Sequence, residues 1–313
     1  MLNGKSIEAI KNKHYFVESF PLDGDAPKQF IKLYSFEEDS GIRRRNFKTW
    51  VAYIAKTAEK WYPHESVIEY MINRVGQTLG ITMNEVRLYK INEQIRFLSQ
   101  FFLKKNESLI HGAEICGEFL EDMELAKQIA DEKKTARELF TFEFITDALK
   151  AIFTRNHEMI IEDLVKMLAF DAIVGNNDRH FYNWGIIATK KISNQLPKFA
   201  PVYDSARGLL WNVSDESIVN WIKMQKTDGT HILKIYPRIS IEGDKEIGHF
   251  GLMEFLKKQK SSYKETINSL ASLDNEAASL EMLEKEFYPF FIKERCELTT
   301  YILKERSKII REI

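Results

Sequence analysis

Residues 175–208 have the sequence GNNDRHFYNWGIIATKKISNQLPKFAPVYDSARG, and this stretch determines the fold expected around the polar residues of the chain. Residues 183–189 alternate and carry enough β-branched side chains to predict a strand, and 198–203 predicts a second apolar strand after a turn. If these strands pair as an antiparallel hairpin, Asn183 before the first and Asp204 just past the second lie side by side, because neighbouring strands are about 5 Å apart.

The polar side chains of this hairpin match the needs of phosphoryl transfer. An amide oxygen of Asn183 and a carboxylate of Asp204 can share a hard cation, and Mg²⁺ prefers a few such oxygens together with water and substrate phosphates. Asp178 precedes them in a loop rich in Asn and Gly, where its carboxylate could accept a proton from an attacking hydroxyl. Phosphoryl transfer needs metal ligands, an orienting carboxylate and a further cation, so these residues predict part of such a site.

The cation is predicted from a strand near the start of the chain. Lys32 stands in the middle of FIKLY, residues 30–34, where it would face a cleft and contact the nonreacting phosphates. A carboxylate is needed to hold its ammonium group, and the helix expected over 65–79 offers two. Glu69 is the first choice, but Glu65 lies nearer the edge of the apolar arc of that helix, so helical geometry alone leaves both open.

Alternation and helical periodicity divide the first hundred residues into strands and helices. Residues 14–34 predict a β-hairpin around a polar loop that contains Gly and Pro. Apolar residues recur at three- and four-residue steps over 47–61, which predicts an amphipathic helix, and 65–79 predicts a second helix. Residues 84–102 predict a further hairpin whose two strands are separated by only two residues.

Beyond residue 102 the pattern is mainly helical. Residues 103–112 are polar and are expected to be flexible, and helical periodicity then covers about 135–153 and 159–173 and returns from 254 onward. We therefore expect an α+β chain with two lobes, and clefts between lobes commonly bind small ligands. The expected parts are a small mixed N-lobe with strands and two helices, residues 1–102, and a larger, mainly helical C-lobe, residues 103–313, that carries the hairpin 175–212.

Composition excludes several classes of protein. Lysine plus arginine (45) nearly balance aspartate plus glutamate (46), so the chain lacks the positive field of a nucleic-acid-binding protein. Cys116 and Cys296 lie far apart without metal-ligand neighbours and are predicted to be free thiols in a reducing compartment. The N-terminal residues lack the apolar segment of a signal peptide, and no run reaches the length of about 18 apolar residues that a membrane span needs. We therefore expect a soluble protein that is cytoplasmic as made.

The same residues resemble the HipA-like serine/threonine kinases. In that family a D-R-H-x-x-N catalytic loop is followed by a strand hairpin and a Y-D metal ligand, which residues 178–183 and 203–204 match. FIKLY resembles the nucleotide-lysine strand of the family, EYMINRVGQTLG (69–80) its E-x10-G helix, and QIRFLSQFF (94–102) the strand that enters the interlobe hinge. Each motif alone is common in loops, strands or helices, but their conjunction in this order over most of the chain is a strong signal.

The resemblance implies a protein-kinase-like fold and a serine/threonine protein kinase that uses ATP and Mg²⁺ and also autophosphorylates. The implied partner is a protein substrate with a Ser or Thr acceptor. The implied site residues are Asp178 as catalytic base, Lys32 as the lysine that touches the ATP phosphates, Glu69 as its partner, Asn183 and Asp204 as magnesium ligands, and Gln100, Phe101 and Phe102 as nucleotide-binding hinge residues.

Two features depart from the family pattern. The glycine-serine phosphate loop is not evident, and LDGDAPKQ (22–29), with Gly24 alone, occupies its place. We expect no counterpart of the domain that longer members place before their kinase lobes, so toxin–antitoxin partnership and operator binding are not expected either. Length and motif placement are similar to the short, single-chain members, and this likeness implies translocation into host cells.

Two other functions compete with a protein kinase. Lipid or small-molecule kinases use the same catalytic loop, but a lipid headgroup calls for a basic apron after Asp204, and residues 205–217 carry one arginine and two acids. A nucleotide-binding pseudokinase that acts as an interaction module would fold without turnover, and the missing glycine-rich loop keeps this alternative open.

Overall fold

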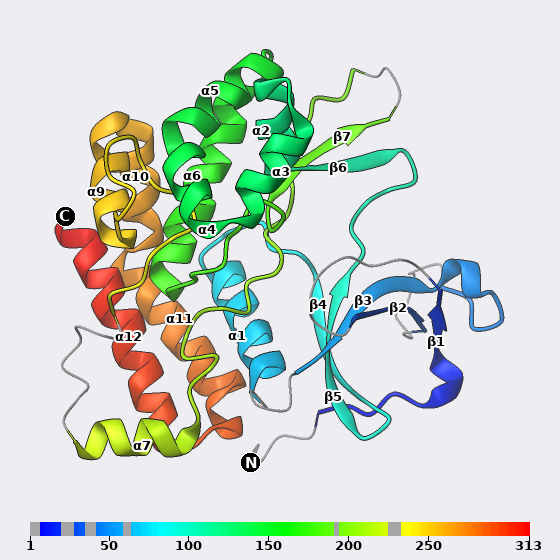
Figure 1. Ribbon diagram of the computed structural model, residues 1–313. Helices are drawn as coiled ribbons and strands as arrows, with labels where there is room; N and C mark the ends of the chain where they lie inside the picture. Colours follow the sequence, from blue (N-terminus) through cyan, green and yellow to red (C-terminus); the bar gives the residue numbers. More distant parts are fainter. Residues whose placement is uncertain (1–6, 20–27, 35–41, 59–63, 191–193, 225–232) are drawn as a thin grey trace.

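The structure is a computed structural model that describes residues 7–19, 28–34, 42–58, 64–190, 194–224 and 233–313. A smaller strand-rich part lies beside a larger helical part (Figure 1). The expected α+β class, with a small mixed part followed by a mainly helical one, is confirmed.

The strand-rich part is built on a five-stranded antiparallel sheet. Its strands, in spatial order, are β1 (Tyr15–Glu18), β2 (Lys28–Leu33), β3 (Val51–Thr57), β5 (Gln94–Gln100) and β4 (Val86–Ile91), and the short 3-10 helix η1 (Asn12–His14) precedes β1. The β1–β2 and β4–β5 pairings confirm both predicted hairpins. Asn92 and Glu93 form the second turn with φ of 48° and 65°, the left-handed pair that suits the twist of a two-residue hairpin. The loop of the first hairpin, residues 20–27 with Gly24, lies outside the described residues.

The helix predicted over residues 47–61 is wrong. The 3-10 helix η2 (Phe47–Thr49) is followed by β3, which pairs with β2 on one side and β5 on the other. Tyr53 and Ala55 are buried in the sheet while their neighbours are more exposed, which is the alternation of a strand. Small and β-branched residues in VAYIAKT satisfy both periodicities, and the backbone partners on both sides decide in favour of the strand. Residues 59–61 lie outside the described residues.

The second predicted helix is confirmed as α1 (Glu65–Thr78). Its apolar stripe, which includes Val67, Ile68 and Met71, is buried, and the helix lies against β4 and β5 on one side and α11 (Leu273–Glu286) on the other. Gly80 follows with φ of 75°, a left-handed conformation that suits glycine and ends the helix. Helix α1 therefore joins the sheet to the helical part.

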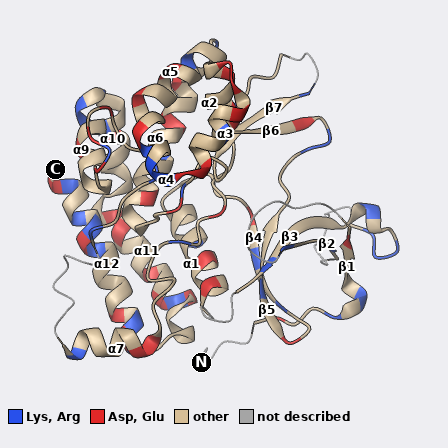
Figure 2. Cartoon of the chain, viewed as in Figure 1, with Lys and Arg blue, Asp and Glu red and all other residues tan. Residues whose placement is uncertain are grey.

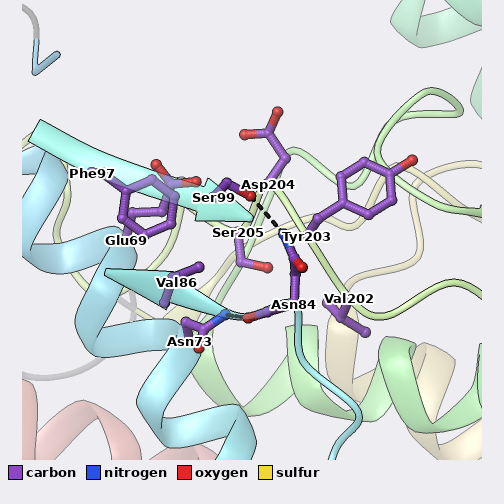
Figure 3. Close-up of a pocket in the computed structure, with 10 residues that line it drawn as sticks. All are labelled: Glu69, Asn73, Asn84, Val86, Phe97, Ser99, Val202, Tyr203, Asp204 and Ser205. Atoms are coloured by element: carbon purple, nitrogen blue, oxygen red, sulfur yellow. Dashed lines mark hydrogen bonds between the residues drawn. The ribbon is translucent and has the colours of Figure 1, made fainter. Parts of the chain in front are cut away.

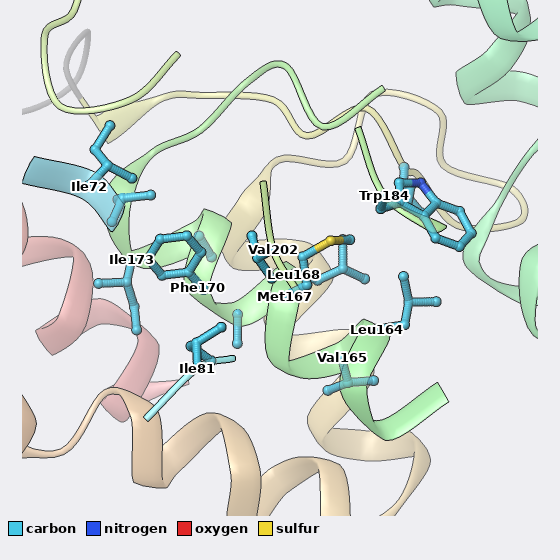
Figure 4. Close-up of a cluster of buried hydrophobic side chains, with 14 of the residues drawn as sticks. Ile72, Ile81, Leu164, Val165, Met167, Leu168, Phe170, Ile173, Trp184 and Val202 are labelled. Atoms are coloured by element: carbon cyan, nitrogen blue, oxygen red, sulfur yellow. The ribbon is translucent and has the colours of Figure 1, made fainter. Parts of the chain in front are cut away.

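The helical part packs around α6 (His157–Val174), which is buried along most of its length (Figure 4). The helical stretch expected over 135–153 is divided in two, because Thr141 caps the second helix by accepting a hydrogen bond from the Phe144 amide at 3.2 Å. The other elements are α2 (Gly112–Leu120), α3 (Met123–Asp131), α4 (Lys133–Leu139), α5 (Phe142–Ile152), α7 (Asp215–Lys223), α9 (His249–Gln259), α10 (Ser261–Leu270), η3 (Tyr288–Phe290) and α12 (Lys293–Glu312).

A second sheet carries the hairpin that holds Asn183 and Asp204. Strand β7 (Gly185–Thr189) lies between β6 (Glu107–His111) and β8 (Lys198–Phe199), and all pairings are antiparallel. The predicted hairpin is confirmed, although its second strand is only two residues long. Strand β6 was not expected, because residues 103–112 look polar. It forms because β7 offers an edge for pairing.

The chain after β8 pairs with the strand-rich part. Met83 and Val202 form a parallel bridge, in which the Asn84 amide donates to the Val202 carbonyl at 2.9 Å and the Val202 amide donates to the Thr82 carbonyl at 2.8 Å. This ladder brings Asp204 close to the five-stranded sheet.

The surface carries both signs of charge. Lys and Arg alternate with Asp and Glu over the helices, and neither sign covers one side of the molecule in this view (Figure 2). None of the helices in the described ranges is long and apolar enough to cross a membrane. Cys116 and Cys296 are both free thiols, as predicted.

Candidate active site

The loop after α6 is fixed by the helix that precedes it. Gly175 ends α6 with φ of 67°, and the Asn176 side chain then donates to the Asp171 carboxylate at 2.9 Å. Asp171 lies in the last turn of α6 and is 1% exposed. The loop therefore leaves the helix in one direction, with Asp178 two residues further on.

Arg179 joins this loop to both ends of the hairpin. Its Nε and Nη2 each donate to the Asp171 carboxylate at 2.9 Å. Its Nη1 donates to the carbonyls of Asn183 at 3.0 Å and Tyr203 at 2.5 Å, and Nη2 also donates to Ser205 Oγ at 2.8 Å. These contacts use the whole donor capacity of a guanidinium group, and the side chain is buried. One cation thus brings the Asn183 and Tyr203–Asp204 segments together, as the hairpin argument expects.

Asn183 is oriented by the loop that precedes it. Its Nδ2 donates to the Asp178 carbonyl at 2.9 Å, and its backbone amide donates to the His180 carbonyl at 2.9 Å. The amide nitrogen is used in this way, which leaves Oδ1 as the atom suited to a metal ion. His180 supports the loop, because its Nδ1 accepts a hydrogen bond from the Tyr182 amide at 3.3 Å.

Lys56 in β3 joins the sheet, α1 and the hairpin. Its Nζ lies 2.9 Å from Glu69 Oε1 and 2.7 Å from Asp204 Oδ1. The side chains of Lys56, Glu69 and Asp204 are 13%, 4% and 30% exposed, so the pair with Glu69 is buried and the Asp204 carboxylate is partly open to solvent. Asp204 has φ of 53°, a left-handed conformation that Asp tolerates better than most residues and that functional sites often contain.

The pKa values in this cluster follow from burial and from the shared cation. Burial opposes ionisation of Asp204, but the charge and hydrogen bond of Lys56 hold its pKa well below the usual range. Burial raises the pKa of Glu69 to about 7, against the opposing effect of Lys56. Burial would lower the pKa of Lys56, but Asp204 and Glu69 together raise it above the ordinary value. Asp204 is therefore the ionised partner, and Glu69 is the carboxyl group closer to protonation.

The structure does not bring Lys32 to Glu69. Lys32 Nζ instead lies 3.0 Å from Glu18 Oε2 on β1, in a half-exposed pair. The expected Lys32–Glu69 pair is therefore not formed, because β3 lies between β2 and β5 and presents Lys56 to α1. Of the two helix carboxylates, Glu69 is the one bound to Lys56.

Sequence reasoning missed Lys56 because its segment was expected to be a helix. Within VAYIAKT, residues 51–57, the buried Tyr53 and Ala55 alternate with Ile54 and Lys56. Taken as a strand, the same segment would have given a mid-strand lysine that competes with Lys32. The strand alternation was present in the sequence, but the alanines also recur at helical spacing, and this favoured the helix.

A small pocket opens beside this cluster (Figure 3). The cavity has a volume of only about 10 Å³, which is close to the space of one water molecule, so it does not by itself accommodate a nucleotide. Asn84 spans it, accepting from Asn73 Nδ2 at 2.9 Å and donating to Ser99 Oγ at 2.7 Å. The lining residues are Glu69, Asn73, Asn84, Val86, Phe97, Ser99, Val202, Tyr203, Asp204 and Ser205.

The expected hinge residues lie at the end of β5. The Gln100 carbonyl accepts from Asn84 Nδ2 at 3.0 Å, and the Phe101 amide donates to the Ala52 carbonyl at 2.9 Å. The Phe102 ring lies 5.7 Å from the Tyr203 ring, centroid to centroid. Residues 100–102 therefore contact both β3 and the segment that carries Asp204.

Asp178 is surrounded by basic side chains that the sequence patterns did not single out. Arg238 Nη2 lies 2.6 Å from Asp178 Oδ1, and Arg207 Nε lies 3.9 Å from Oδ2. These arginines come from segments 29 and 60 residues further along the chain than Asp178 (207 − 178 and 238 − 178). No spacing pattern in the sequence links either of them to the loop.

Comparison with known proteins places the fold. The structure is similar to that of the proinflammatory kinase CtkA from Helicobacter pylori, with a TM-score of 0.71, 13% identity and coverage of 98% of both chains. It is also similar to HipA of Shewanella oneidensis MR-1, solved with HipB and its operator DNA, with a TM-score of 0.57, 13% identity and coverage of 95% of this chain and 68% of that one. No curated protein matches the chain in sequence. The sequence pattern of the HipA-like C-terminal domain matches residues 21–272, which is most of the chain, so this protein belongs to the HipA-like C-terminal domain family.

Proposed function

We propose that this chain is a serine/threonine protein kinase, which transfers the γ-phosphoryl group of ATP to a hydroxyl group of a protein. The observation that carries the proposal is Lys56, whose ammonium group contacts both a buried helix carboxylate and Asp204. A cation between these two acids, beside a loop that carries Asp178 and Asn183, supplies the parts that phosphoryl transfer requires. Membership of the HipA-like family and the likeness to a kinase fold support the same assignment.

The donor set fits a magnesium ion. The low pKa of Asp204 keeps its carboxylate ionised, and this side chain is partly open to solvent. Asn183 Oδ1 adds a neutral oxygen, and hard cations such as Mg²⁺ accept this combination together with phosphate oxygens. When bound, Mg²⁺ and ATP supply the phosphoryl group and neutralise its charge. Asn183 and Asp204 would hold the ion, and Lys56 would then exchange its contact with Asp204 for one with the phosphates.

Asp178 is proposed as the residue that takes the proton. As the hydroxyl oxygen of the acceptor attacks the γ-phosphorus of ATP, its proton passes to the Asp178 carboxylate and ADP departs. The carboxylate is suited to this role because Asn183 holds its backbone and because it lies near the protein surface. We assign Gln100, Phe101 and Phe102 to the nucleotide base, since they line the link between the two parts of the chain.

A phosphorylation assay tests the proposal. The purified chain is incubated with radiolabelled ATP, Mg²⁺ and dephosphorylated casein, and a parallel reaction without casein reports autophosphorylation. We expect transfer to Ser or Thr, and Asp178→Asn should lower the rate by roughly 10²- to 10⁴-fold, the usual cost of losing a general base.

The assay also separates the alternatives. Phosphorylation of phosphoinositide vesicles but not of casein would assign a lipid kinase. If Mg²⁺ and ATP raise the melting temperature but no phosphate is transferred to any acceptor, the chain is a pseudokinase and the proposal fails.

A further inference from the structure

Two arginines contact the single carboxylate of Asp178, and one lysine interacts with it electrostatically. Arg238 and Arg207 contact its two oxygens at 2.6 Å and 3.9 Å. Lys133, the first residue of α4, lies close enough for electrostatic interaction with both Arg238 and Asp178. The side chains of Asp178, Arg207 and Arg238 are 26%, 31% and 23% exposed, so this cluster is open to solvent. Three positive groups and one negative group leave the cluster with an excess of positive charge.

The two arginines are held in place by the fold. The Arg207 guanidinium lies 3.8 Å from the centre of the Trp211 ring, a cation–π contact. Arg238 follows Pro237, whose carbonyl accepts a hydrogen bond from Arg137 of α4. Arg137 also donates to the carbonyls of Lys245 at 2.8 Å and Ile247 at 2.9 Å. The segment that presents Arg238 is therefore fixed to α4, and little further ordering is needed to bind a ligand.

The positive charges of the cluster act on one another. Partial desolvation, followed by the charges of Arg238 and Arg137, lowers the pKa of Lys133, and Asp178 only partly opposes this. The Nε of Arg238 is buried and donates to no acceptor among the described residues. A second anion would reduce the repulsion between the cations.

We propose that Lys133, Arg207 and Arg238 bind an acidic side chain of the acceptor protein, next to the hydroxyl that is phosphorylated. The inference rests on the proposed function, because Asp178 marks the acceptor hydroxyl only in a kinase. The three cations come from the helical part of the chain, whereas Lys56 of the sheet serves the nucleotide. An acidic side chain would also draw Arg238 away from Asp178 and free this carboxylate to take the proton. The acceptors are thus Ser or Thr residues flanked by Asp, Glu or a phosphorylated residue.

Peptide binding tests this inference without requiring turnover. Three fluorescein-labelled peptides carry one serine flanked on both sides by glutamate, by glutamine or by phosphoserine, and fluorescence anisotropy gives their dissociation constants. We expect the glutamate peptide to bind at least tenfold more tightly than the glutamine peptide. Arg238→Gln and Lys133→Gln should each reduce this ratio by roughly twofold to tenfold, the usual effect of losing one solvent-accessible hydrogen bond. Arg155→Gln, which changes an exposed arginine between α5 and α6, is the matched control and should leave the ratio unchanged. The phosphoserine peptide distinguishes a phosphate site from a carboxylate site.

Each outcome decides one of the two proposals. Equal binding of the glutamate and glutamine peptides, or equal rates of phosphorylation, would refute the acidic site and leave the kinase proposal standing. Selective binding of acidic peptides without any phosphate transfer would refute the kinase proposal and leave the anion site. If Arg238→Gln and Lys133→Gln abolish the rise in melting temperature caused by Mg²⁺ and ATP, the cluster binds nucleotide phosphate and the inference is wrong.

Discussion

Replacing Lys56 with methionine should show whether Lys56 or Lys32 is the lysine that contacts the nucleotide in the proposed function. Methionine keeps most of the length of the side chain but removes the cation that contacts Glu69 at 2.9 Å and Asp204 at 2.7 Å. Removing one preorganised electrostatic group from an active site costs roughly 10²- to 10³-fold in kcat, or about 2.7–4 kcal/mol. We expect a loss of this size for Lys56→Met.

The Lys56→Met change should lower the unfolding free energy by less than the loss of a buried ion pair usually does. Breaking a buried pair costs about 3–5 kcal/mol when a charge is left unpaired. The raised pKa of Glu69, about 7, allows this group to take up a proton instead, and Asp204 is partly exposed to water. The expected loss of unfolding free energy at pH 7 is therefore below that range, about 1–3 kcal/mol, measured by urea denaturation.

Lys32→Met is the matched control. The Lys32–Glu18 pair is 23% and 43% exposed, and pairs of this kind contribute about 0–1 kcal/mol. We expect kcat/KM for phosphorylation to stay within about twofold of the unchanged protein. A Lys32→Met protein that loses as much activity as Lys56→Met, or a Lys56→Met protein that keeps its activity, would refute the assignment of the nucleotide lysine.

Three further predictions concern Glu69, Arg179 and Asp204. Because the pKa of Glu69 is raised from 4.5 to about 7, the folded chain binds more protons than the unfolded chain between these pH values, and this group's contribution to stability is lost as pH rises from about 4.5 to 7. In urea titrations at pH 5 and pH 7.5, Glu69→Gln should therefore lose less unfolding free energy on this rise than the unchanged chain, by about 3 kcal/mol at most. An equal loss in both proteins would show that burial does not raise the pKa of Glu69. Arg179→Lys cannot reproduce the five contacts of the guanidinium group and should lower the unfolding free energy by about 3–5 kcal/mol. Arg155→Lys on the surface is the control and should change it by less than about 0.5 kcal/mol. A similarly small effect at Arg179 would mean that other contacts hold the hairpin. Asp204→Asn keeps a residue that tolerates a left-handed backbone, so it should fold but lose the magnesium-dependent part of the rise in melting temperature with ATP; an unchanged rise would remove Asp204 from the metal site.

Much of the fold follows from local patterns. The hairpin of β4 and β5 is predicted because its two strands alternate on either side of a two-residue turn. Helix α1 is predicted because its apolar stripe is uninterrupted up to Gly80. In the hairpin that carries Asn183 and Asp204, strand spacing and turn chemistry were enough to place the two segments together. These features depend on residues that are close in sequence.

The rest depends on contacts that no local pattern encodes. Lys56 meets Asp204 across 148 positions of sequence, and it does so because β3 is placed between β2 and β5. The alanines and aromatic residues around β3 satisfy both helical and strand periodicity, so only its partner strands distinguish the two. Arg238 reaches Asp178 because Arg137 fixes a distant segment to α4. Tertiary pairing decides such cases, and a single sequence does not display it.

The ladder between Thr82, Asn84 and Val202 restricts how the molecule can open. It attaches the β4 edge of the five-stranded sheet to the chain that bears Asp204, so this edge serves as a pivot. Strand β1 lies at the opposite edge and would travel furthest in any tilt of the sheet. We therefore expect β1 and β2 to move most, and on the proposed function a nucleotide would leave on that side while Asp204 stays with the pivot.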